Sequence, residues 1–140
     1  MIPASGRDRY QKCVLEKLLL RRHFPQFDVK LVGNRLTARG TMTTEQNGSK
    51  YVIQLGLQPR NDPTVRILRP DIPVDQKVHI HSSGNLRLFD WREQKWQKGW
   101  HLHETIIPWT AEWLMFYELY LLTGKWLGKS AEHGNIDEYA

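Results

Sequence analysis

The sequence predicts an α+β domain: a helix, a four-stranded antiparallel meander, an irregular segment and a C-terminal helix. Three observations support this prediction: a helical apolar pattern near the beginning of the chain, alternating apolar segments in the middle, and an apolar helical pattern over 105–122. The 140 residues suffice to bury one hydrophobic core. We therefore expect a single domain, 1–140, with a flexible tail at 134–140.

The first predicted helix covers residues 6–23. Its apolar residues, beginning with Tyr10 and Cys13, recur at helical spacing, and Pro25 cannot continue the pattern. Cys13 is the single cysteine of the chain, so it cannot form an internal disulfide. We expect it to pack in the core, where an apolar environment leaves a thiol unreactive.

Four segments follow in which apolar residues alternate with polar ones, the period of a half-buried strand. Gly33-Asn34, the polar stretch 43–49 and Asn61-Asp62-Pro63 separate them as turns. Short turns between strands predict an antiparallel meander, with the helix packed on one sheet face. The apolar members of the four segments are Phe27, Val29 and Leu31; Leu36, Ala38 and Met42; Tyr51, Ile53, Leu55 and Leu57; and Val65 and Ile67.

Residues 74–103 follow two prolines and show little helical periodicity. Residues 105–122 then form the second predicted helix, with Pro108 suited to its first turn and Gly124 to the position just past its end. Aromatic residues crowd the faces of this helix, which predicts that protein surrounds it.

The net charge of +5 and the isoelectric point near 9.5 fit a protein that meets phosphates or an acidic protein surface. Much of this charge lies within residues 1–24. No apolar run reaches the length of a membrane span and no signal pattern is seen, so we expect a cytoplasmic protein without a membrane partner. The charged residues of this stretch are Arg7, Arg9, Lys12, Lys17, Arg21 and Arg22, with Asp8 and Glu16.

Two segments carry a family resemblance. Residues 79–88 read HIHSSGNLRL, which resembles the active-site segment of prokaryotic ubiquitin-conjugating-type proteins. The Pro-Trp, Glu-Trp-Leu and Thr-Gly-Lys-Trp elements within 105–128, with His133, resemble the conjugating protein of type II cyclic-oligonucleotide-based antiphage signalling systems (CBASS). The resemblance covers nearly the whole chain and implies a ubiquitin-conjugating-enzyme-like fold in an antiphage protein-conjugation pathway.

Position 87 departs from the family pattern, because the resemblance implies a catalytic cysteine where this chain has Arg87. Thioester exchange needs a thiolate, whereas a guanidinium keeps its proton and has no nucleophilic lone pair. Cys13, on the first helix, is not expected to replace it. The chain is then either a natural inactive relative, acting as a scaffold, or a substituted form of a catalytic protein.

A third explanation moves the nucleophile to Ser83, or to Ser82, with His79 or His81 as general base and an oxyester as product. The alternative interpretation is that Ser-Ser-Gly is an ordinary turn. The resemblance itself implies a structural role for His79, and His81 is a candidate to steady the oxyanion of a working site.

The resemblance also implies partners: an activating enzyme, and a ubiquitin-like protein or a cyclic-nucleotide synthase. In ubiquitin-conjugating enzymes the basic face of the first helix docks the activating enzyme. The exposed candidates by helical position are Arg7, Lys12, Lys17 and Arg21. No cofactor is expected.

Two rival functions use other residues. Two His-X-His pairs could together supply four zinc ligands, namely His79, His81, His101 and His103. Tryptophans interspersed with arginine could stack on the bases of a single strand, although no recognised binding motif appears and we do not expect a nucleic-acid partner; they are Trp91, Trp96 and Trp100.

Overall fold

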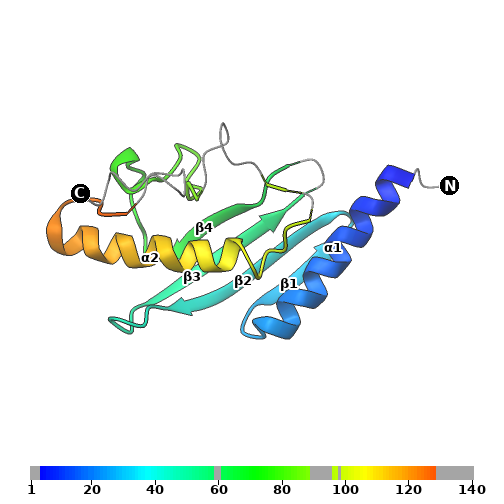
Figure 1. Ribbon diagram of the computed structural model, residues 1–140, viewed down its shortest axis with the longest axis horizontal. Helices are drawn as coiled ribbons and strands as arrows, with labels where there is room; N and C mark the ends of the chain where they lie inside the picture. Colours follow the sequence, from blue (N-terminus) through cyan, green and yellow to red (C-terminus); the bar gives the residue numbers. More distant parts are fainter. Residues whose placement is uncertain (1–3, 59–60, 89–95, 98, 129–140) are drawn as a thin grey trace.

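The computed structural model describes residues 4–58, 61–88, 96–97 and 99–128, with only the backbone for 4–10 and Gln76. The predicted α+β order of elements is confirmed (Figure 1). The elements are α1 (Ala4–His23), β1 (Asp28–Val32), β2 (Arg35–Thr43), β3 (Lys50–Leu57), β4 (Thr64–Arg69), a short 3₁₀ turn (Gln76–Val78) and α2 (Ile106–Thr123).

Each helix ends at or near a residue that cannot continue it. The α1 helix begins two residues before the predicted start and ends at His23, two residues before Pro25, which cannot donate a helical hydrogen bond. Gly124 adopts a left-handed conformation with φ 73°, and its N–H donates to the Tyr120 carbonyl at 2.8 Å. A glycine in this conformation closes α2 without a steric penalty from Cβ.

The four strands form one antiparallel sheet in the order β1-β2-β3-β4. Ala38 lies opposite Val29 on one side and Leu55 on the other, and Leu55 lies opposite Val65. Because side chains alternate between faces along a strand, this register gathers the apolar residues on a single face. The predicted alternation is therefore confirmed strand by strand.

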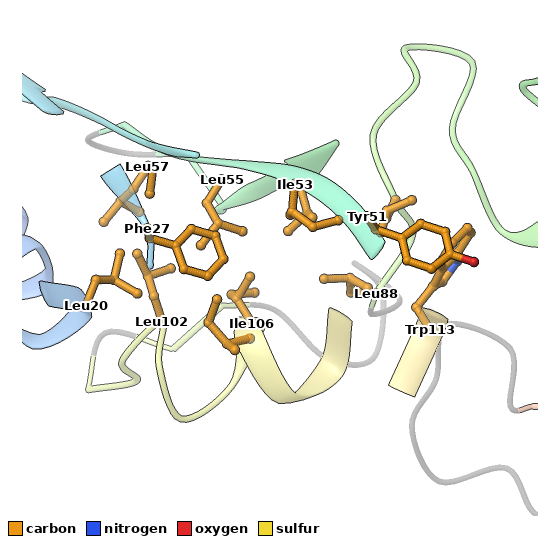
Figure 2. Close-up of a cluster of buried hydrophobic side chains, with 14 of the residues drawn as sticks. Leu20, Phe27, Tyr51, Ile53, Leu55, Leu57, Leu88, Leu102, Ile106 and Trp113 are labelled. Atoms are coloured by element: carbon orange, nitrogen blue, oxygen red, sulfur yellow. The ribbon is translucent and has the colours of Figure 1, made fainter. Parts of the chain in front are cut away.

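Both helices cover this apolar face. In Figure 1, α2 runs across the strands while α1 lies beside β1. Figure 2 shows Leu20 of α1 and Ile106 of α2 in one cluster with Ile53 and Leu55 of the sheet. All four of these side chains are 1% exposed or less, so they form the centre of the hydrophobic core.

A buried carboxylate, Glu16, joins α1 to the segment that precedes α2. Its side chain is fully buried, and its oxygens accept hydrogen bonds from the Leu102 N–H at 2.7 Å and from Nδ1 of His101 at 2.8 Å. Lys12 Nζ lies 3.2 Å from Glu16 Oε2 and also donates to the Trp100 carbonyl at 2.7 Å. The buried charge is therefore both paired and hydrogen-bonded, as a buried charge must be.

A second buried carboxylate, Glu118, joins α2 to the loop between β2 and β3. It accepts hydrogen bonds from the hydroxyl of Thr44 at 3.2 Å and from the amides of Asn47 and Gln46 at 3.3 and 3.4 Å. Burial, followed by the nearby Glu118 charge, raises the pKa of Tyr51 to about 12, so this phenol stays protonated beside the carboxylate.

Replacement of Glu16 by alanine should destabilise the fold. Glu16→Ala leaves the buried Leu102 N–H without its acceptor and opens a cavity, so we expect a loss of about 2–4 kcal/mol in the free energy of unfolding. Urea denaturation measures this loss. The matched control is Glu45→Ala, since Glu45 is exposed in the β2–β3 loop. Equal stability of the two variants would contradict the structural role of Glu16.

Candidate functional site

Residues 79–88 form a small hairpin beside β4. The Arg87 N–H donates to the His79 carbonyl and the His81 N–H to the Asn85 carbonyl, at 2.8 and 2.9 Å. The Gly84 N–H, on a residue with φ 92°, closes the turn by donating to the His81 carbonyl. Residues 79–88, which carry the first part of the family resemblance, thus form one structural unit.

Arg87 projects from this hairpin between two core residues, Leu86 and Leu88, which are 6% and 5% exposed. Its guanidinium is half-buried, and one terminal nitrogen lies 3.2 Å from Nδ1 of His79. A guanidinium can only donate, so Nδ1 accepts and the ring proton of a neutral His79 lies on Nε2. Nε of Arg87 is buried and has no hydrogen-bond partner within the described residues.

His79 has an uncommon backbone for a residue with a side chain. Its φ is 57°, in the left-handed region, and its ring centroid lies 4.9 Å from that of Trp126. Non-glycine residues in this region cost energy and persist where the surroundings hold them. The Arg87 contact and the Trp126 contact therefore fix the orientation of this imidazole.

His81 and Ser83 lie on the exposed side of the turn. Partial burial, followed by the Arg87 charge, lowers the pKa of His81, although the residue is exposed. The Ser83 hydroxyl accepts a hydrogen bond from the Asn85 N–H at 3.4 Å. Within the described chain Ser83 makes no hydrogen bond to a histidine, so its contacts are those of a turn.

The only thiol of the chain lies elsewhere. Cys13 is buried, and its Sγ donates to the Asn34 carbonyl at 3.3 Å. Burial, with the Glu16 charge as the next cause, raises the pKa of this thiol. The prediction that Cys13 packs in the core is confirmed, and the thiol is disfavoured as a nucleophile.

The two His-X-His pairs belong to different parts of the molecule. His101 pairs with Glu16, and His103 stacks on His23 with ring centroids 4.2 Å apart. His79 and His81 lie instead on the hairpin of Arg87. No group of three His, Cys, Asp or Glu side chains in the described ranges could hold a metal ion. The four histidines therefore do not form the single centre that their spacing suggested.

The tryptophans before α2 pack against one another. The ring of Trp100 meets those of Trp96 and Trp109 edge to face, with centroids 5.8 and 5.6 Å apart. Both Trp96 and Trp100 are half-buried, so this packing leaves less of each ring for stacking on a base. Trp91 lies outside the described residues.

The basic residues of α1 do not all point to solvent. Arg21 is exposed and Lys17 half-buried. Lys12 is not the exposed docking residue that we expected, because its side chain is partly buried and its ammonium group binds Glu16 and the Trp100 carbonyl. The side chain of Arg7 lies outside the described residues, as do the predicted tail 134–140 and His133.

Sequence reasoning missed Glu16 and Glu118 as structural residues. A signal was present for Glu16, which follows Cys13 by three positions and precedes Leu20 by four, and so lies on the buried face of its helix. An acidic residue on such a face predicts a buried partner. Lys12, four positions earlier on the same helix, is within reach of such a pattern, but His101 and Leu102 lie 85 and 86 residues away and are not.

One sheet with both helices on one face, and a hairpin holding position 87 beside the edge strand, defines an E2-like (ubiquitin-conjugating-enzyme-like) fold. The model of the type II CBASS E2 protein family matches residues 16–134. The chain therefore belongs to the E2-like proteins of CBASS antiviral defence. A comparison with curated proteins gave no match.

None of the helices in the described part of the chain combines the length and apolar character that a bilayer crossing requires.

Stability should fall as the pH is lowered because of His103. Burial, followed by the neighbouring His23, lowers the pKa of His103, with a smaller lowering by His101 and opposing effects of Glu104 and Glu16. Protonation therefore favours the unfolded state, and stability present above pH 6.5 is lost as the pH falls below that value. The unfolding temperature, measured from about pH 7.5 to about pH 5, reports this loss of stability, because that range brackets the ordinary histidine pKa of about 6.5.

The variant His103→Phe keeps an aromatic ring beside His23 but removes the titrating group. We expect its unfolding temperature to depend less on pH than that of the parent protein over the same range. An identical pH dependence in the two proteins would assign the effect to other groups.

Proposed function

We propose that this E2-like protein takes part in a cytoplasmic CBASS conjugation pathway by binding its partners without forming a thioester. The observation that carries the proposal is Arg87, which occupies the position of the expected cysteine between Leu86 and Leu88. With Cys13 buried in the core, no thiol is available at the hairpin. A scaffold role, or a substituted catalytic protein, is consistent with these facts.

The environment of Arg87 supports binding rather than catalysis. Its guanidinium is half-buried, and within the described residues its one side-chain hydrogen bond is to Nδ1 of His79, with no ion pair to a carboxylate. A partly desolvated guanidinium with this surrounding attracts an acidic group of a bound protein. The hairpin would then hold a partner through an ion pair where its relatives form a covalent bond.

The proposed partners are an activating enzyme, and a ubiquitin-like protein or a cyclic-nucleotide synthase. Docking of an acidic surface is supported by Arg21, which is exposed, and by Lys17, which is half-buried, and Arg7 remains part of the proposed set. Lys12 is left out of this set because its charge is neutralised by Glu16.

Thioester formation is the direct test. Incubation of the protein with a candidate activating enzyme, a ubiquitin-like protein and ATP should give no adduct that a thiol reagent cleaves, because a guanidinium cannot attack the activated carbonyl. The variant Arg87→Cys reports whether the rest of the site remains competent, and Arg87→Ala is its control. Denaturing gels with and without reductant detect the adduct.

A reductant-sensitive adduct on the parent protein would contradict the proposal. A hydroxylamine-sensitive adduct that disappears in Ser83→Ala would replace it with the oxyester mechanism. Charging of Arg87→Cys but not of Arg87→Ala would mean that only the nucleophile is missing from the site.

Docking through α1 is tested by charge reversal. The double variant Lys17→Glu/Arg21→Glu should bind the activating enzyme roughly tenfold more weakly, with less dependence on salt, because complementary surface charge mainly steers association. Calorimetry at two salt concentrations measures both effects. The control is Lys125→Glu, an exposed reversal beyond α2. Unchanged affinity of the double variant would exclude this docking surface.

A further inference from the structure

The face of the sheet opposite the helices carries a concentration of positive charge. Alternation along the strands points one set of side chains to the core and the other set outward. Among the outward residues of the described strands, Asp28 is the one acidic side chain. The basic members of this outer face are Lys30, Arg35, Arg39, Lys50, Arg66 and Arg69, all of them exposed.

Strand register arranges these charges in rows across the sheet. Arg39 and Arg66 lie directly opposite Gln54 from its two sides, so they stand two strand spacings, or about 10 Å, apart. Arg69 lies opposite Val52, two residues from Gln54 along β3 and past the bulge between Val52 and Ile53. The charges therefore form an array on a rigid sheet rather than a flexible cluster.

The charge of this array is not neutralised by ion pairs. Arg39 donates to the side-chain oxygen of Gln54 at 3.0 Å, and Arg66 donates to the Ser83 carbonyl. Both acceptors are neutral, so both arginines keep their full charge. In the part of the chain that the structure describes, none of the six basic residues of the outer face forms a salt bridge.

The other side chains of the outer face identify the class of ligand. Four of the six basic residues are arginines, which bind phosphate oxygens in a bidentate manner. The strands add the hydroxyls of Thr37, Thr41, Thr43 and Thr64, which also donate to phosphate.

The outward positions of these four strands hold no aromatic residue, so the outer face offers no ring on which an unpaired base could stack. The apolar residues of the outer face are few, namely Val32, Val52 and Leu68, and they include none of the aromatic anchors typical of a protein interface. We propose that the outer face binds the phosphate backbone of a nucleic-acid duplex.

This surface differs from the tryptophan-rich segment that the sequence suggested for single strands. It was not visible in the sequence as a basic stretch, because its members are spread over residues 30–69 and meet only through strand pairing. The proposal is independent of the chemistry at position 87, and the two can fail separately.

The test is binding to a fluorescent duplex of arbitrary sequence, once as DNA and once as RNA, with a length of about 20 base pairs or two helical turns. Fluorescence anisotropy measures the affinity at a series of salt concentrations. The variant Arg35→Gln/Arg39→Gln/Arg69→Gln removes three charges but leaves Arg66 on its carbonyl. We expect its affinity to fall by roughly tenfold or more, and its slope of log affinity against log salt to decrease by about one for each phosphate that the variant no longer neutralises.

The matched control, Arg21→Gln/Arg22→Gln/Lys125→Gln, removes the same net charge from exposed positions outside the outer face. It should keep the greater part of the affinity and of the salt slope. An equal loss in both variants would reduce the effect to net charge and overturn the proposal. Tighter binding of poly-glutamate than of either duplex would assign the outer face to an acidic protein, and preference for a single strand would also overturn it.

Discussion

The position of α1 relative to the rest of the fold depends on one buried carboxylate. Glu16 binds the ammonium group of Lys12, the imidazole of His101 and the backbone N–H of Leu102. Two of these three donors, His101 and Leu102, come from the segment that leads into α2. The sheet alone holds its strands through consecutive hairpins, but the second helix is separated from β4 by 36 residues. Hydrogen bonds to a buried charge are directional, whereas apolar packing is not. They therefore fix the position of this segment more specifically than packing alone.

Glu118 performs the corresponding task at the other end of the molecule, where it attaches α2 to the β2–β3 loop. Between these two carboxylates the core contacts of Ile106 and Trp113 keep α2 against the sheet (Figure 2). The hairpin of Arg87 is held in turn by Trp126, whose ring contacts both His79 and Trp113. The candidate site is thus positioned by residues far from it in sequence.

Local patterns predicted the elements of this fold well because each carries its own signal. Alternation identified the strands, Pro25 ended α1, and Gly124 closed α2 within one residue of the expected position. The site was predictable only where a motif surrounds it, as at 79–88. Pairings over long separations gave no such signal, which is why the contact of Lys12 with the Trp100 carbonyl was missed and the four histidines were expected in one cluster.

Arg66 belongs to two surfaces at once. Its backbone lies in β4 beside Asn85, and its guanidinium holds the carbonyl of Ser83 at the turn of the Arg87 hairpin. An anion that competes for this guanidinium must weaken its hold on the turn, and a partner that stabilises the turn must in return disfavour that anion. Through the side chain of Arg66, anion binding on the outer face of the sheet is thermodynamically linked to the conformation of the hairpin.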